Sequence, residues 1–175
     1  MLPMSNPPLT RSRPATWAEV RTHGRVMRYR QSGSGPAVLL LRQSDRSNRL
    51  WPELRAALHG DFRLLEPDIP GDTDDVARWI ADFLEGLGLS GVSVIATDAF
   101  CIPALELALL GADQVARAVL VPDGLTGETG LDGTLTASIH AATVALLVVR
   151  AGAPAEDAVP LVTGFLAGQG SAVAG

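Results

Sequence analysis

The sequence predicts an α/β fold, a three-layer sandwich around a mainly parallel sheet of about six strands. Short, continuously apolar runs recur along the chain, as expected for strands buried on both faces of a parallel sheet. Stretches with helical periodicity separate these runs, and a strand–helix–strand order gives right-handed crossovers between parallel strands. The runs expected to form neighbouring parallel strands are Ala37–Leu41, Phe62–Glu66, Val92–Ala96 and Ala118–Val121.

An antiparallel hairpin is expected ahead of the first of these strands. Two short extended segments, Trp17–Thr22 and Arg25–Gln31, flank the dipeptide His23-Gly24, which suits a tight turn. Before the hairpin, residues 1–14 contain four prolines and little apolar periodicity. We therefore expect a disordered arm over residues 1–14 and one domain over residues 15–175.

The helical stretches lie between and after the strands. The clearest is Asp74–Leu87, where apolar residues recur on one stripe and acids stand at the start, near the positive end of the helix dipole. Leu50–His59 and Ala99–Leu110 have the same character. After Pro122 the pattern changes to two C-terminal helices, starting from about residue 134, over Leu135–Arg150 and Glu156–Leu166.

This assignment leaves Ala118–Val121 as the last strand, at an edge of the sheet. An unpaired edge invites pairing with another chain. We expect the C-terminal helices, a second copy in a homodimer, or a partner chain to cover it.

The composition excludes several classes of protein. A net charge of −5 argues against a nucleic-acid partner, and the single Cys101 allows no internal disulfide. Residues 1–14 lack the apolar core of a signal peptide, and Ala141–Val149 is far shorter than the ~20 residues of a membrane span. We expect a cytoplasmic protein with no membrane partner.

Three local motifs, in this order and spacing, resemble the α/β-hydrolase superfamily. Gly33–Pro36 running into Ala37–Leu41 is similar to that family's third strand, and Pro67–Gly71 is similar to the turn after its fourth. Val92–Leu109 is similar to the fifth strand, the nucleophile elbow and the following helix. The resemblance covers roughly residues 17–123 and implies a truncated α/β-hydrolase-like fold that ends before the family's seventh strand.

The sequence departs from this family where the chemistry would be. The family elbow is Gly-x-nucleophile-x-Gly, because strand and helix approach closely there. Here the aligned residues 96–100 lack both glycines, and Asp98 stands in the nucleophile slot. The family's His-Gly after the third strand, which helps to form the oxyanion hole, is Arg42-Gln43. The general-base histidine follows an eighth strand in the family, and no residue of this chain inherits it by alignment.

Asp98 has two interpretations. A carboxylate can act as a nucleophile, and the haloalkane dehalogenase and epoxide hydrolase branches use Asp in this slot. Alternatively, Arg42 and Asp98 follow adjacent strands, ~4.8 Å apart, and form an ion pair that fills the former active site. The pair leaves neither charge alone in a desolvated place.

Other residues near this edge are weaker candidates. Asp123 directly follows the strand Ala118–Val121, where some members of the superfamily place the triad acid; otherwise Asp123-Gly124 is a turn. His140 is the histidine that a cap would bring near Asp98; otherwise it packs on a helix. Cys101 is expected to be a buried, inert thiol beneath the elbow.

The remaining polar residues predict no cofactor and no metal site. His23 is interpreted as a turn residue and His59 as a helix-end residue. The acids at 72, 74 and 75 are interpreted as a helix start, and the sequence has neither a Cys/His cluster for zinc nor a glycine-rich phosphate loop.

Two function classes follow from these observations. The first is a pseudoenzyme without the Ser-His-Asp triad that binds a small apolar ligand or a partner protein. The second is an atypical enzyme, of hydrolase or isomerase/lyase type, with a site centred on Asp98.

Overall fold

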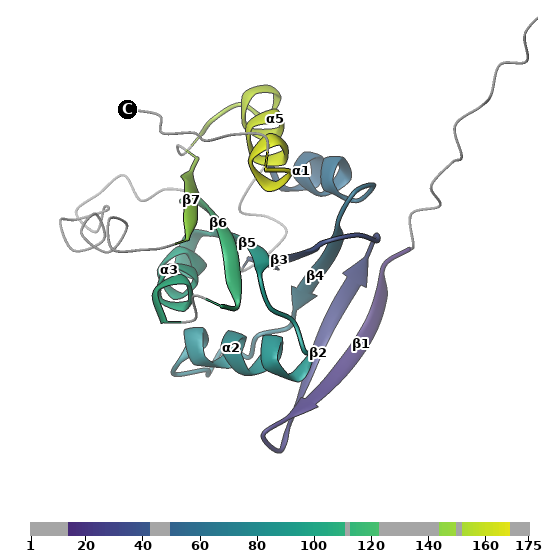
Figure 1. Ribbon diagram of the computed structural model, residues 1–175, viewed down its shortest axis with the longest axis vertical. Coiled ribbons are helices and arrows are strands. Elements are labelled where there is room, and N and C mark those ends of the chain that lie inside the picture. The colour runs from purple at the N-terminus through teal and green to yellow at the C-terminus, as the bar shows by residue number, and fades with distance from the viewer. Residues whose placement is uncertain (1–13, 43–49, 111–112, 123–143, 150–151, 169–175) are drawn as a thin grey trace, which may run out of the picture.

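In the computed structural model, the protein forms a three-layer α/β sandwich (Figure 1). The structure describes residues 14–42, 50–110, 113–122, 144–149 and 152–168, with the backbone alone at positions 98 and 110. Seven strands form one sheet in the order β1-β2-β4-β3-β5-β6-β7. The strands are β1 (Thr16–Thr22), β2 (Arg25–Ser32), β3 (Ala37–Leu41), β4 (Arg63–Pro67), β5 (Val92–Thr97), β6 (Val115–Val121) and β7 (Ala145–Val148).

The four predicted inner strands are confirmed as parallel neighbours. β4 pairs with β3, β3 with β5, and β5 with β6, all in parallel. In the β3–β5 register, Leu41 lies opposite Ala96. The residues that follow these two, Arg42 and Thr97, therefore reach the same edge of the sheet.

The expected hairpin is also confirmed. β1 and β2 pair antiparallel, with Thr22 opposite Arg25, so His23 and Gly24 make a two-residue turn. Both turn residues have positive φ, 45° at His23 and 73° at Gly24. This is the pattern of a type I′ turn, whose twist matches that of the strands it joins. β2 then pairs antiparallel with β4, which joins the hairpin to the parallel strands.

The helices cover both faces of the sheet. α2 (Val76–Gly86) and α3 (Cys101–Leu110) pack on one face, and α1 (Leu50–Leu58) and α5 (Ala155–Leu166) pack on the other (Figure 1). The apolar stripe predicted for α2 supplies Ile80, Phe83 and Leu84, all fully buried. Asp75 caps this helix, because its Oδ1 accepts a hydrogen bond from the N–H of Arg78 at 2.9 Å.

The prediction for the region after Pro122 was wrong in part. Residues 145–148, expected within a helix, form β7, which pairs in parallel with β6. The Ala118–Val121 edge is therefore covered by the chain itself, and the expectation that helices, a second copy or a partner chain cover it is corrected. The run Val144–Val149 is apolar at every position, and so short a run fits a buried strand as well as a helix. The predicted helix over residues 156–166 is confirmed as α5.

A glycine-rich loop fixes the start of β3 against the loop between α1 and β4. Gly33 and Gly35 have φ of 73° and 114°. A side chain at Gly33 would overlap the carbonyl oxygen of Phe62 and lie 2.8 Å from that of His59. The resemblance motif at 33–36 thus has a packing reason, because only glycine allows this backbone path.

Within the described residues, none of the helices is both long and apolar enough to span a membrane.

Candidate functional site

The carboxyl ends of the inner parallel strands define the candidate site. In open α/β sheets ligands bind outside these ends. Arg42 follows β3, Glu66 lies near the end of β4, and Thr97 ends β5. Asp98 opens a short 3-10 turn, η1 (Asp98–Phe100), that leads into α3.

An ion-pair network occupies this edge. Nη2 of Arg42 lies 3.2 Å from Oε2 of Glu66, and Nη2 of Arg55 lies 3.1 Å from Oε1 of the same carboxylate. The side chains of Glu66 and Arg42 are 9% and 15% exposed, so both charges are largely withdrawn from water. A carboxylate placed there requires a cationic partner, and two guanidiniums supply it.

The ring of Trp51 lies against the guanidinium of Arg42 in this network. The guanidinium carbon of Arg42 lies 5.6 Å from the centre of the Trp51 ring, a cation–π distance. Trp51 and Arg55 are four residues apart on α1, so they share one face of the helix. That face packs against the sheet, which places the network between α1 and the ends of β3 and β4.

Two buried polar groups near the network have no hydrogen-bond partner among the described residues. They are the hydroxyl of Thr97 and the indole N–H of Trp51. Thr97 is 1% exposed, and Trp51 is 5% exposed. An unpaired buried donor costs roughly 1–3 kcal/mol, so a ligand that accepts hydrogen bonds from these groups would recover free energy.

The turn from β5 into α3 is the short 3-10 segment η1, and its residues differ from the family's elbow motif. Ala96, in place of the first elbow glycine, is fully buried. The Cys101 thiol donates to the carbonyl oxygen of Ala96 at 3.5 Å, and Cys101 is 4% exposed. Its expected burial beneath the elbow is confirmed.

The structure describes only some of the site residues predicted from the sequence. Asp98 has the expected place at the end of β5, but its side chain lies outside the described part, so the Arg42–Asp98 pair stays a prediction. Gln43, Asp123 and His140 also lie outside the described residues.

The residues that sequence reasoning missed are Glu66, Arg55, Trp51 and Thr97. Glu66 carried a usable signal. It is a carboxylate that directly follows two leucines in the predicted strand Phe62–Glu66, and a carboxylate in a buried strand must have a partner. Nothing in the local pattern of Leu50–Leu58 identifies Arg55 as that partner.

Comparison with protein-family models gives no match, and comparison with curated protein sequences gives none either. Solved structures do match. Carboxylesterase CesB from Bacillus subtilis superposes with a TM-score of 0.53 at 24% identity, over 62% of this chain and 43% of that one. Epoxide hydrolase CorEH gives 0.53 at 24%, over 67% of this chain and 46% of that one.

A third similar structure is haloalkane dehalogenase DatA from Agrobacterium tumefaciens C58, with a TM-score of 0.50 at 22% identity. The match covers 62% of this chain and 41% of that one, so the chain spans less than half the length of all three proteins. The strand order, the placement of the helices and these superpositions agree: the chain has the α/β-hydrolase fold.

Proposed function

We propose that this protein is a non-hydrolytic α/β-hydrolase-fold protein that binds a small, mostly apolar molecule at the carboxyl edge of the sheet. The observation that carries the proposal is the buried network of Arg42, Glu66 and Arg55. In the serine hydrolases of this fold, a backbone N–H from the loop after the third strand helps to stabilise the oxyanion. Here that loop begins with a guanidinium held by a buried carboxylate, which favours a fixed binding surface over acyl transfer.

The residues around the network indicate the chemistry of the ligand. Beside the two guanidiniums and one carboxylate, the Thr97 hydroxyl and the Trp51 indole N–H are hydrogen-bond donors without an acceptor among the described residues. The same face of the sheet is otherwise apolar, with Leu40 and Val121 buried beside them. A small molecule with an apolar body and one anionic or carbonyl acceptor fits this combination.

A binding comparison tests the proposal. We expect octanoate to bind more tightly than 1-octanol in isothermal titration calorimetry, because a charged carboxylate accepts stronger hydrogen bonds than a neutral hydroxyl does. Thr97→Val and Trp51→Phe should each weaken octanoate binding by about tenfold. Ser93→Ala, at the other end of β5, is the matched control and should bind as the wild type does.

Turnover provides the second arm of this test. Hydrolysis of 4-nitrophenyl butyrate should not exceed the buffer rate. A rate that one serine substitution abolishes would overturn the proposal, as would equal octanoate affinity in the wild type and in both site variants.

The alternative is an atypical enzyme that uses Asp98, and it is favoured by the position of this residue where β5 turns into α3. An Asp nucleophile would form a covalent ester with an epoxide or a haloalkane. Mass spectrometry after incubation with styrene oxide or 1-bromobutane would detect that adduct on the wild type and not on Asp98→Asn. No adduct, together with octanoate binding, selects the binding protein.

A further inference from the structure

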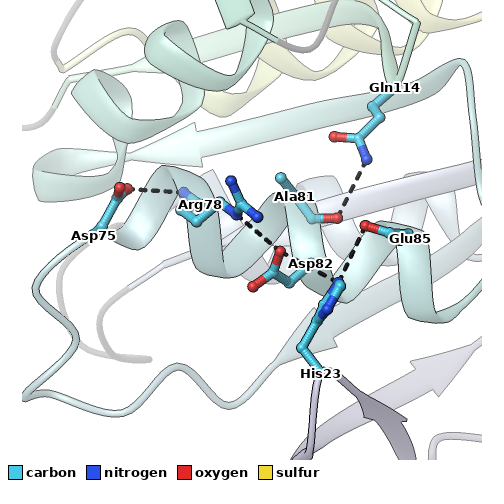
Figure 2. A network of polar contacts seen from close by, with 7 residues as sticks. All are labelled: His23, Asp75, Arg78, Ala81, Asp82, Glu85 and Gln114. Carbon is cyan, nitrogen blue, oxygen red and sulfur yellow. Dashed lines mark hydrogen bonds and ion pairs between the residues drawn. The ribbon is translucent and has the colours of Figure 1, made fainter.

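A second polar cluster lies far from the carboxyl edge, where the tip of the β1–β2 hairpin meets α2 (Figure 2). Nε2 of His23 lies 3.4 Å from Oε2 of Glu85 and 3.9 Å from Oδ1 of Asp82. The three ligand-type atoms all lie within 4.8 Å of one another. Asp82 and Glu85 are three residues apart on α2, so they share one face of the helix, and His23 reaches them from the hairpin turn.

We propose that His23, Asp82 and Glu85 form a binding site for a borderline divalent transition-metal ion such as Zn²⁺. Two ligands ~2.1 Å from one zinc ion in tetrahedral geometry are separated by ~3.4 Å. The His23–Glu85 separation equals this value, and the His23–Asp82 separation needs only a small side-chain rotation to reach it. One imidazole nitrogen and two carboxylates make three protein ligands, and water supplies the fourth.

The backbone around the cluster holds these side chains in place. Gly86, next to Glu85, packs so closely on β1 that a Cβ there would lie 2.9 Å from Cβ of Thr22, next to His23. Helix and hairpin are therefore held together directly beside the three ligands. A site that is already assembled loses less conformational entropy when a metal binds.

His23 itself has an unusual backbone conformation. Among the described non-glycine residues it is the one with positive φ, at 45°. Asn or Gly is the usual first residue of a type I′ turn. Histidine at this position costs a modest amount of conformational free energy. It also places the imidazole next to the two carboxylates, and residues with such backbone strain cluster at functional sites.

Acidic residues outnumber the one arginine, Arg78, among the residues that line the neighbouring groove. Nε of Arg78 lies 3.0 Å from Oδ1 of Asp82, which orients this nearly buried carboxylate as an outer-shell partner would. Asp74, Asp75 and Glu106 add three acids along a groove of about 840 Å³ between α2 and α3, which Asp82 and Glu85 also line. The imidazole selects Zn²⁺, Ni²⁺ or Co²⁺ over Mg²⁺ and Ca²⁺, which prefer oxygen ligands alone.

The experiment is a zinc titration of untagged protein by isothermal titration calorimetry, with urea melts in Zn²⁺ and in EDTA. We expect one zinc ion per chain and a higher melting midpoint in Zn²⁺. His23→Asn keeps a residue suited to the turn, so the fold is retained, and it should lower the zinc affinity at least about 100-fold. Glu85→Gln should also lower the affinity, and Mg²⁺ should not compete at millimolar concentration.

His59→Asn is the matched control, since it removes another histidine at the end of α1. Equal zinc affinity in the wild type and in folded His23→Asn would overturn the proposal. It would also fail if His59→Asn abolished zinc binding as His23→Asn does. Absence of zinc binding at millimolar concentration would leave His23 as an ordinary partner of Glu85 in an ion pair and refute the site.

Discussion

At the scale of single residues, Glu66 organises the carboxyl edge of the sheet. Its two carboxylate oxygens receive different guanidiniums, one from the loop after β3 and one from α1. Arg42 also lies over the Trp51 ring at a cation–π distance. Glu66 therefore links the end of β3 to α1, and Arg42 links this pair to the Trp51 ring. The free energy of this network depends on how much solvent reaches each charged group, and Glu66 is the least exposed of the three charged residues.

Removing the Glu66 carboxylate should destabilise the protein. Glu66→Ala leaves two guanidiniums close together without an anion, and we expect a loss of about 3 kcal/mol in the free energy of unfolding. Glu66→Gln should lose less, because the amide oxygen still accepts one hydrogen bond. Urea denaturation measures both changes, with Glu53→Gln on the exposed side of α1 as the control. A loss below about 0.5 kcal/mol for Glu66→Ala would contradict the role assigned to the network.

The Arg42–Asp98 pair predicted from the sequence can be tested in the same way. Asp98→Ala should destabilise the protein by roughly 3 kcal/mol if the two charges are paired and buried. A double-mutant cycle with Arg42→Ala then gives a clear coupling free energy. A double-mutant cycle on Arg42 and Glu66 serves as the reference, because Nη2 of Arg42 lies 3.2 Å from Oε2 of Glu66. Additive losses in the Arg42–Asp98 cycle would rule out the pair.

At the scale of elements, two segments set the frame of the site. The glycine loop at 33–36 positions β3 against the α1–β4 loop, and β7 continues the sheet beyond β6. The conformation of the loop requires glycine at positive φ, and the placement of β7 requires burial of its apolar side chains against α5. Each requirement can be tested by a substitution with a nearby control.

Gly33→Ala should cost more than Gly24→Ala, although both glycines have φ of 73°. The left-handed backbone costs each alanine about 1 kcal/mol. Gly24 has open space around it, whereas a Cβ at Gly33 meets two carbonyl oxygens. We expect a loss of more than about 2 kcal/mol at Gly33, measured by urea melts. Equal losses would mean that the α1–β4 loop moves away without cost.

Leu147→Ala should test the placement of β7. Leu147 is 6% exposed and belongs to the core on the α1/α5 face, while its neighbour Val148 is 38% exposed. We expect Leu147→Ala to lose about 2–3 kcal/mol and Val148→Ala to lose less than about 1 kcal/mol. If segment 145–148 were helical, as its apolar run first suggested, Leu147 and Val148 would not alternate between a buried and an exposed face. The two substitutions would then not differ in this way.

At the scale of the whole molecule, one sheet separates two apolar cores. Trp79 belongs to the core under α2 and α3, and Trp51 belongs to the core under α1 and α5. Both cores use side chains from the same strands, alternating from face to face. Neither core can keep its structure once the sheet is lost.

The two cores should therefore unfold together. Variants that keep only Trp51 or only Trp79 report on one core each, and in each variant the fluorescence and far-UV circular dichroism transitions in urea should coincide. Trp17, 59% exposed on β1, is replaced by Phe in both. Separate midpoints for the two signals within either variant would show that one face of the sheet melts first.

Much of this architecture could be predicted from the sequence by itself, because it rests on local periodicity. The inner strands, the hairpin turn at His23-Gly24 and the amphipathic helix α2 are each specified by spacing within fewer than twenty residues. The loss of both elbow glycines and the presence of Asp98 can also be read directly from the chain. Glu66 could have been identified as a residue in need of a partner.

Only the tertiary structure decided which residues meet. Apolar segment 145–148 is compatible with a helix or a strand, and pairing with β6 made it a strand. Arg55 becomes the partner of Glu66 because α1 packs over the ends of β3 and β4. His23 lies 62 positions from Glu85 and reaches it because Gly86 lets α2 pack closely on β1. Contacts between distant segments depend on how elements pack, and local sequence patterns carry little information about that packing.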